Sequence, residues 1–360
     1  MCSGMLMAES TMSAAVSIAQ ELRVKVSQVE TTIQLLDDGA TVPFIARYRK
    51  EATGALDDTQ LRLLAERLHY LRELDNRRQV ILQSIKDQDK LTPELSAAIL
   101  AADTKTRLED LYLPYRPKRR TKAQMAKEAG LEPLARSLKD QPILSPEAEA
   151  EKYINPEAEI IDVKTALEGA RHILMEEFAE QADLLNELRE FLWDQGQLHA
   201  KATNDKGNAN ASKFTDYFNY VEAIKKIPSH RALALFRGRR EGILQLALHI
   251  PEGKQHIGEE SIARFFQIHN EQRPADNWLL ETVALTWKIK LFTKLELELF
   301  ARLREAADEE AIQVFARNLR GLLLAAPAGH KCVIGLDPGI RTGVKVAVVD
   351  HTGKVLDYST

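Results

Sequence analysis

Apolar residues recur every three or four positions along most of the chain, which is the period of an amphipathic α-helix. The longest stripe follows an acidic N-cap region at Asp57–Asp58–Thr59 and runs through Leu61, Leu64, Leu68, Leu71, Leu74, Ile81, Leu82 and Ile85. Shorter helical patterns occupy 14–39, 166–178 and 182–193, and longer ones 276–304 and 309–325. Pro93 suits the first turn of a further helix. The pattern predicts a mainly α-helical chain.

The two-residue alternation of a β-strand replaces the helical period in two places. Glu241–Ile250 is the one strand-like run expected in the middle of the chain, ended by Pro251 and Gly253. Near the far end, apolar runs at 332–336, 344–349 and 354–358 are separated by the turn sequences DPGIRTG and DHTG. Proline fixes φ and glycine allows positive φ, so these turns reverse the chain. The runs predict an antiparallel three-stranded meander.

Composition narrows the class of protein. The 360 residues suffice for two or three domains with proper cores, and the net charge of −4 means that any contact with a polyanion must come from a local patch. The two cysteines, Cys2 and Cys332, have no partner at zinc-ligand spacing, which favours the reducing cytoplasm. No apolar run is long enough to span a membrane, and residues 1–13 lack a signal-peptide pattern and are expected to be a disordered tail.

The strongest local charge lies in the sequence YRPKRRTKAQMAK, residues 115–127. Its six basic residues, with no acidic one among them, are Arg116, Lys118, Arg119, Arg120, Lys122 and Lys127. Prolines place it in an extended loop that leads into a helix near Thr121. The cations would neutralise phosphates while Tyr115 stacks on an unpaired base. Alternatively, the segment is a strap between domains, with its arginines paired to acidic helices around Glu109 and Asp110.

Two other patterns invite comparison with nucleic-acid-binding proteins. The two short helices at 14–39 resemble a helix-turn-helix, but the second carries Glu30, Asp37 and Asp38, so we interpret the pair as structural. His230–Arg231 and Arg237–Arg240 form a weaker basic patch that would either hold domains together or bind phosphate. The polar stretch 201–213 is expected to be a mobile loop.

Five sequence blocks occur in an order that resembles the Tex family of bacterial transcription accessory proteins. They are TVPFIARYRKEATG, LEDLYLPYRPKRRTKAQMAKEAGLEPLA, SHRALALFRGRREGIL, AIQVFARNLRGLLLAAP and IGLDPGIRTG, and the resemblance covers residues from about 14 to 360. It implies a helical N-terminal region, a YqgF-type domain of the RNase H-like fold, a helix-hairpin-helix region and an RNA-binding OB-fold. The expected divisions of this chain are helical residues 14–200, a second helical region with a short strand at 201–328, and the start of the YqgF-type domain at 329–360.

The sequence VIGLDPGIRTGVKVAVVD also resembles the opening of the RNase H-like superfamily, in its YqgF and Holliday-junction-resolvase branch. That family places its first metal-binding carboxylate at the position of Asp337. Two-metal catalysis needs carboxylates from several elements, and one strand end supplies a single ligand. A plain alternative is that Asp337 caps its own turn through its side chain.

The resemblance also implies that this last domain is truncated. An RNase H-like sheet has about five strands with helices on both faces, whereas the meander supplies three strands. We expect the helix at 309–325 to cover its apolar face, because three strands need such cover to be stable. A valine-rich edge would still be open to fraying.

The leading functional hypothesis is a nucleic-acid-binding accessory factor of transcription, cytoplasmic, with single-stranded RNA as the expected ligand and the transcription machinery as a further partner. It requires no cofactor. The alternative is an Mg²⁺-dependent RNase H-like or Holliday-junction nuclease that uses Asp337, although one carboxylate within the chain argues against activity. An actin-like ATPase shares the meander but would need a second phosphate loop. No GxxxxGK motif or histidine pair at metal-ligand spacing is present in the sequence.

Overall fold

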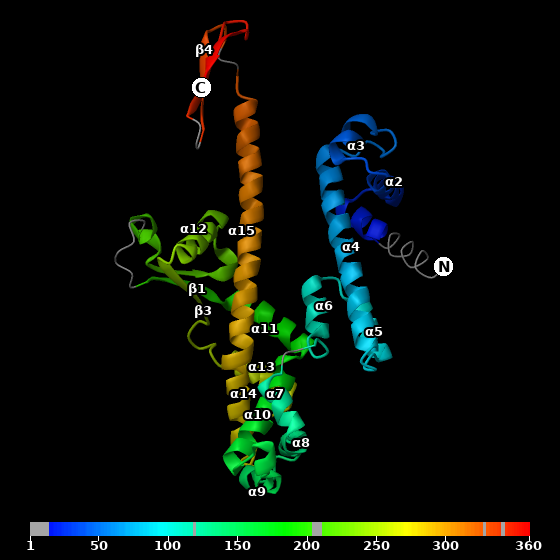
Figure 1. Cartoon of the computed structure of the whole chain (residues 1–360), viewed down its shortest axis with the longest axis vertical. Coiled ribbons are helices and arrows are strands. Elements are labelled where there is room, and N and C mark those ends of the chain that lie inside the picture. The colour runs from blue at the N-terminus through cyan, green and yellow to red at the C-terminus, as the bar shows by residue number, and fades with distance from the viewer. Residues whose placement is uncertain (1–13, 118–119, 204–210, 327–328, 340–342) are drawn as a thin grey trace. The chain divides into compact units, whose positions relative to one another are not determined.

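The computed structural model describes residues 14–117, 120–203, 211–326, 329–339 and 343–360 (Figure 1). The described chain is mainly α-helical, as the sequence predicted, and contains two small antiparallel sheets. It divides into two compact units. The first contains the residues up to Gln195 together with Ile250–Leu297, and the second contains Gly196–His249 together with Glu298–Thr360. The predicted disordered tail at 1–13 lies outside the described residues.

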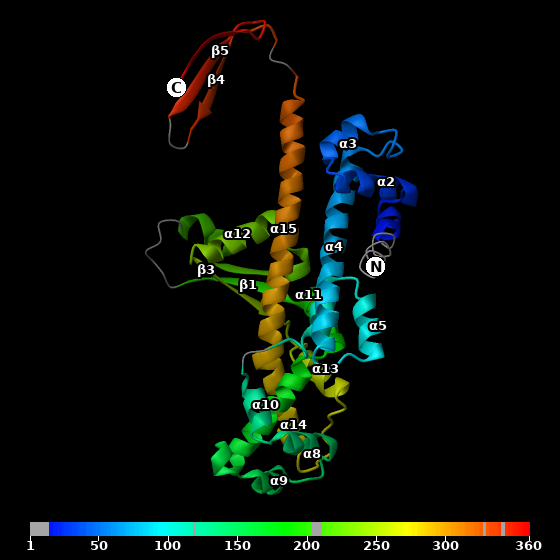
Figure 2. The same ribbon diagram turned by 45° about the vertical axis from the view of Figure 1, so that its right-hand side comes forward.

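The first unit begins with short helices against the start of a long one. Residues 14–22 are helical and are followed by α2 (Val26–Asp37), α3 (Val42–Tyr48) and α4 (Asp58–Lys86). Both Figure 1 and Figure 2 show α2 and α3 beside the N-terminal end of α4. Their shared core consists of Ala15, Ile18, Ala19, Val29, Ile33, Ile45, Leu56, Leu61, Leu64 and Leu68. The two helices predicted before Gly39 are therefore present and are fixed by this core.

Helix α4 begins where the sequence predicted. The Asp57 carboxylate accepts a hydrogen bond from the Gln60 amide at 2.8 Å, and the Gln60 side chain accepts one from the Asp57 amide at 3.0 Å. This reciprocal capping box satisfies two amides that otherwise have no partner at a helix start. The predicted stripe is buried along the helix at Leu61, Leu64, Leu68, Leu74, Ile81 and Ile85. Its second half packs with α5 (Pro93–Ala101) and α6 (Lys105–Tyr112).

Replacing Asp57 with alanine is expected to remove about 1 kcal/mol from the stability of the first turns of α4, because the Gln60 amide loses its acceptor. Hydrogen exchange followed by mass spectrometry should show about fivefold faster exchange in the peptide that covers these turns. Asp57→Asn is the control, since asparagine caps as well as aspartate. Equal exchange in the alanine variant and the unmodified protein would contradict the capping role.

The rest of the first unit is a helical assembly around α10 (Val163–Ala179). It includes α7 (Lys122–Glu128), α8 (Glu132–Asp140), α9 (Pro146–Ala150), α11 (Ala182–Gln195), α13 (Ile257–Phe265) and α14 (Asp276–Leu285). The stretch 142–156 contains α9 and a 3₁₀ turn at Glu151–Tyr153. The Ala275 amide donates to the Pro142 carbonyl at 3.0 Å, so segments far apart in sequence meet within this unit.

A buried ion pair joins two helices of the first unit. The Arg189 guanidinium of α11 lies 2.9 Å from the Asp110 carboxylate of α6, and both side chains are less than a tenth exposed. The Lys294 ammonium lies 3.9 Å from the same carboxylate. In the same unit, Gly258 of α13 lies directly against the ring of Trp287.

The helices predicted separately at 276–304 and 309–325 form one continuous helical run instead. Helix α14 passes into a π-helical segment at Thr286–Leu291 and then into α15 (Phe292–Leu323). The prediction of two separate helices was wrong. The residues between them, Glu305-Ala-Ala-Asp308, include no glycine or proline that would end a helix. The π-helical segment has no counterpart in the predicted periodicity.

The second unit contains a three-stranded sheet of which the sequence predicted only one strand. Strands β1 (Gln197–Ala202), β2 (Asn219–Ala223) and β3 (Leu244–His249) pair antiparallel in the order β2-β1-β3. The apolar alternation of β1 rests on Leu198 and Ala200 alone, which is too weak a signal to detect. Helix α12 (Ser229–Arg240) covers β3. Of the predicted mobile loop at 201–213, residues 204–210 lie outside the described residues.

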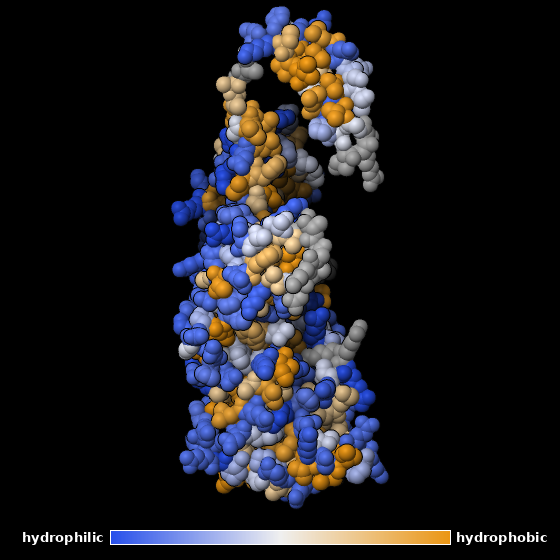
Figure 3. Space-filling model, turned by 90° about the vertical axis from the view of Figure 1, so that its left-hand side faces the viewer, coloured by the Kyte–Doolittle hydropathy of each residue, from blue (hydrophilic) through white to orange (hydrophobic). Residues whose placement is uncertain are grey.

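The predicted C-terminal meander is confirmed. Strands β4 (Val333–Pro338), β5 (Val344–Val349) and β6 (Val355–Ser359) pair antiparallel in sequence order. The expected cover by the helix at 309–325 is absent, since Phe315 and Leu322 are exposed, as are Ile334 and Leu336 on the sheet. The physical reason is that α15 runs straight on to Leu323 without a bend that would return it to the strands. Figure 3 shows hydrophobic side chains gathered on this sheet.

Candidate nucleic-acid interface

The basic segment predicted at 115–127 lies between two helices of the first unit. Helix α6 ends in a turn in which the Tyr115 and Arg116 amides both donate to the Tyr112 carbonyl, at 2.9 and 3.0 Å. Helix α7 then begins after Thr121, whose hydroxyl accepts from the Gln124 amide at 3.0 Å. The predicted helix start near Thr121 is therefore confirmed. Lys118 and Arg119 lie outside the described residues.

The described cations of this segment fall into two groups. The Arg120 guanidinium pairs with the Glu128 carboxylate at 2.7 Å, so its charge is partly used within the segment. A hydrogen bond from Gln124, followed by the one from Arg120, holds the pKa of Glu128 below its usual value. Arg116, Lys122 and Lys127 are exposed and form no ion pair with any residue that the structure describes. The positive charges of Arg116, Lys122 and Lys127 are thus available to bind an anion.

The strap interpretation predicted that Glu109 and Asp110 would hold these arginines. In the structure, Glu109 instead pairs with Arg77 at 2.5 Å, and Asp110 pairs with Arg189. Both carboxylates are therefore occupied by other helices. The described partners of the two carboxylates are thus Arg77 of α4 and Arg189 of α11. For Lys118 and Arg119, which lie outside the described residues, the strap stays a prediction.

Tyr112, at the end of α6, and Tyr115, the first residue of the segment, both pack against neighbouring residues. Tyr112 is buried, and its hydroxyl lies 2.9 Å from the Ser84 hydroxyl. Tyr115 is half-buried against the core formed by the second half of α4, and its carbonyl accepts from the Gln88 side chain at 2.9 Å. Because the Tyr115 ring is packed in this way, little of its face is available for stacking on an unpaired base. The segment therefore supplies charge more than stacking.

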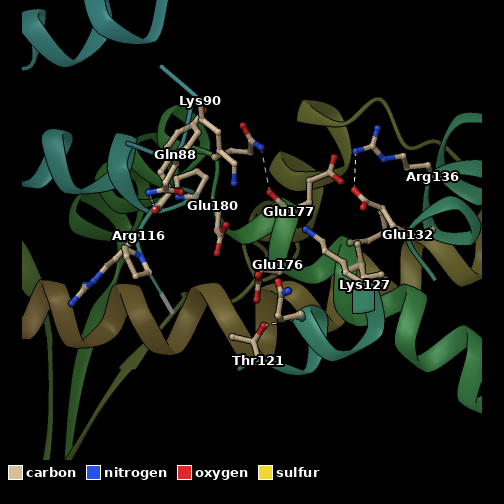
Figure 4. Close-up of a pocket in the computed structure, with 18 residues that line it drawn as sticks. Gln88, Lys90, Arg116, Thr121, Lys127, Glu132, Arg136, Glu176, Glu177 and Glu180 are labelled. Carbon is tan, nitrogen blue, oxygen red and sulfur yellow. Dashed lines mark hydrogen bonds and ion pairs between the residues drawn. The ribbon is translucent and has the colours of Figure 1, made fainter. Parts of the chain in front are cut away.

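A hollow of about 490 Å³ opens beside the segment (Figure 4). Its lining combines both signs of charge, with Lys90, Arg116, Lys127 and Arg136 on one hand and Glu132, Glu176, Glu177 and Glu180 on the other. Glu132 is paired with Arg136 at 2.8 Å, and Glu177 with Lys139 at 2.6 Å. Figure 4 shows the Arg116 guanidinium directed away from Glu176 and Glu180. A nucleic-acid backbone would therefore contact the basic residues at the rim of the hollow and be repelled by its glutamates.

Lys122 also acts on the neighbouring helix α10. Burial lowers the pKa of His172, and the positive charge of Lys122 lowers it further. His172 is thus less readily protonated than a histidine in water.

The weaker basic patch on α12 is largely engaged within the second unit. Arg231 pairs with Glu222 at 3.4 Å, and Arg237 pairs with Glu241 at 2.7 Å. The Arg239 guanidinium lies 5.8 Å from the centre of the Phe300 ring. These contacts join elements within the second unit. The two roles left open by the sequence, holding domains together or binding phosphate, stay predictions.

The carboxylates near Asp337 make local contacts in the part of the meander that the structure describes. Asp337 lies in β4 directly opposite Lys345 of β5. The Asp350 carboxylate accepts from the Thr352 amide and hydroxyl at 2.8 and 2.6 Å, and these bonds lower its pKa. The Asp357 carboxylate accepts from the Tyr358 amide at 2.8 Å. Among the described residues, no group of three or more histidine, cysteine, aspartate or glutamate side chains converges as a metal would require. These residues do not fit a two-metal centre.

The structure shows a second exposed basic surface that the sequence patterns did not predict. It consists of Phe44, Arg47, Tyr48, Arg49 and Lys50, on α3 and the residues after it, and is called the α3 patch below. All five side chains are exposed. The available signal was the run FIARYRK, in which two aromatic residues four apart alternate with cations.

In the part of the chain that the structure describes, no helix has both the length and the apolar character that crossing a bilayer would require.

Three family models match the chain. The model for the Tex-like protein N-terminal domain matches residues 12–86, the Tex central region-like model matches 141–315, and the Tex protein YqgF-like domain model matches 331–360. The chain is 55% identical over 345 residues to the transcriptional accessory protein Tex of Neisseria gonorrhoeae, covering 94% of this chain and 45% of that one.

Two further relatives extend the comparison. Protein tex of Bordetella pertussis is 54% identical over 352 residues, covering 95% of this chain and 44% of that one. The human S1 RNA-binding domain-containing protein 1 is 30% identical over 336 residues, covering 90% of this chain and 33% of that one. The chain thus spans about half the length of the bacterial relatives named here.

Proposed function

This chain belongs to the Tex family of transcriptional accessory proteins, and on that premise we propose that it contacts single-stranded RNA through the basic segment at 115–127 while its helices act as a scaffold. The nucleic-acid role is supported by the family and by the human relative, which is named an S1 RNA-binding domain-containing protein. The transcription machinery is the corresponding protein partner.

The proposal rests on which surface cations form ion pairs and which do not. On α4, Arg62, Arg67, Arg72, Arg77 and Arg78 all pair with carboxylates. On the basic segment, Arg116, Lys122 and Lys127 are exposed and have no such partner among the described residues. Unpaired surface cations that follow one another along the chain can neutralise successive phosphates and release their counterions.

The segment supports binding without sequence preference. Phosphate contacts fix position, whereas sequence is read by groups that reach base edges. Tyr115 is packed against α4, and no aromatic ring of the described segment is fully exposed. Charge is therefore the main contribution, and the affinity should depend strongly on salt.

The test is a salt titration of RNA binding by the variant Arg116→Gln/Lys122→Gln/Lys127→Gln. Each phosphate contact to a single strand contributes about 0.7 to the slope of log K against log salt, so losing three contacts should reduce the slope by about 2. Fluorescence anisotropy of a labelled oligouridine gives the measurement. The control variant, Arg62→Gln/Arg67→Gln/Arg72→Gln, removes three paired arginines and should keep the slope. An unchanged slope in the first variant would assign the segment to structure alone.

A further inference from the structure

The α3 patch brings two aromatic rings and three cations together on an exposed surface. The side chains of Phe44 and Tyr48 lie one turn apart, with ring centres 5.3 Å from each other, and the residues are 41% and 62% exposed. The Arg49 guanidinium lies 5.6 Å from the centre of the Phe44 ring. Arg47 and Lys50 are exposed beside them. The patch thus offers exposed ring faces and positive charge side by side.

The backbone under the patch is firmly held. Ile45 is fully buried in the core shared with α2 and α4, which fixes the orientation of α3. After the helix, the Thr53 hydroxyl donates to the Arg49 carbonyl at 3.2 Å, and the Ala55 amide donates to the Lys50 carbonyl at 2.8 Å. The Gln28 side-chain Nε2 of α2 donates to the Thr53 and Gly54 carbonyls at 3.1 and 2.8 Å. A surface fixed in advance loses little entropy on binding.

The cations of the patch are free of carboxylates. Arg47, Arg49 and Lys50 form no ion pair with any residue that the structure describes, whereas the arginines of the adjoining α4 are paired. Glu51 is the one acidic residue next to them in sequence, so the run from Arg47 to Glu51 carries a net charge of +2. The patch is thus a local positive site on a chain whose net charge is −4.

We propose that the α3 patch binds single-stranded nucleic acid, with a base stacked on Tyr48 and the flanking phosphates held by Arg47, Arg49 and Lys50. Every base has a flat face that an exposed ring can stack on, and single-stranded sites combine such rings with cations. An acidic peptide would use the cations but leave both rings unused. The proposal rests on the RNA-binding role proposed above and adds a second contact that is independent of the basic segment.

The ring is tested by the substitutions Tyr48→Ala and Tyr48→Phe. Tyr48 is 62% exposed, so neither change should disturb the fold. Loss of one stacked base should weaken oligouridine binding by at least about fivefold in Tyr48→Ala, while Tyr48→Phe keeps the ring and the affinity. The fold of each variant is checked by circular dichroism. Equal affinities for Tyr48→Ala and the unmodified protein would exclude stacking at this residue.

The cations are tested by Arg47→Gln/Arg49→Gln/Lys50→Gln, with the same paired-arginine control on α4. The slope of log K against log salt should fall by about 2, as three phosphate contacts are lost. Binding to an RNA duplex should be weaker than to oligouridine, since its bases are not available for stacking. Polyglutamate that displaces the RNA, combined with no effect of Tyr48→Ala, would identify an acidic protein as the occupant and overturn the proposal.

The experiments distinguish the proposal for the α3 patch from the proposal for the basic segment. If the variant of the basic segment weakens binding and the α3 variants do not, the α3 patch is excluded while the proposed function stands. If the α3 variants weaken binding and the basic-segment variant does not, the α3 patch is the RNA contact and the basic segment is structural. Oligouridine that fails to bind the unmodified chain would overturn both.

Discussion

Replacing Asp110 with asparagine is expected to lower the free energy of unfolding of the first unit by about 3 kcal/mol. Asp110 and Arg189 are both buried and lie 2.9 Å apart, so the carboxylate offsets the cost of removing the guanidinium from water. In the asparagine variant the guanidinium stays buried opposite a neutral amide. The Lys294 side chain, 3.9 Å from the carboxylate, is a third exposed and can turn to water. Most of the loss in the free energy of unfolding should therefore come from the buried charge of Arg189.

Urea unfolding followed by tryptophan fluorescence measures this loss. The chain has three tryptophans, and Trp193, Trp278 and Trp287 all belong to the first unit, so the signal reports on that unit alone. The matched variant is Asp110→Leu/Arg189→Met, which removes both charges and should recover most of the lost stability. If the double variant is as unstable as Asp110→Asn, packing at these positions matters more than the charge pair.

Gly258→Ala is the second substitution with a large expected effect, a loss of about 1–3 kcal/mol. A Cβ atom at Gly258 would lie 2.3 Å from the Trp287 ring, closer than atoms can approach without displacement. Alanine is favoured over glycine within a helix by about 1 kcal/mol, which offsets part of the clash. The clash should prevail because Trp287 is 6% exposed and its ring has no free space to enter.

Thermal unfolding with the same fluorescence signal tests this second expectation. Gly321→Ala is the control, since Gly321 lies in the second unit with no atom within 4 Å of the added Cβ, and it should leave this first-unit signal unchanged. Adding Trp287→Phe to Gly258→Ala makes room for the methyl group and should restore part of the loss. A variant Gly258→Ala as stable as the unmodified protein would show that α13 and the π-helical segment can separate at little cost.

Features set by neighbours in sequence could be predicted. The start of α4 follows from Asp57 and Gln60, three residues apart, and its buried stripe follows from the helical period. The meander follows from its turn residues. In each case the interactions that fix the structure are local or repeat at a fixed spacing.

Features set by distant partners could not be predicted. Strand β1 is short and weakly patterned, and it becomes a strand because β2 and β3 flank it. The charges of Arg77 and Arg120 were visible in the sequence, but their partners Glu109 and Glu128 depend on packing. Likewise, the exposure of Tyr48 follows from Ile45 being the one side chain of α3 that is fully buried.

The path of the chain through the two units has a consequence for how this protein can vary. The chain leaves the first unit after Gln195 and re-enters it at Ile250, and near these two points Gln197 and His249 face each other as partners in β1 and β3. Residues 196–249 are therefore nested in the sequence of the first unit, between Gln195 and Ile250, and their two ends are neighbours in the sheet. Insertions and deletions are best accommodated where the two ends are close. The nested segment can thus change in length or content over evolution while the surrounding helices keep their connections.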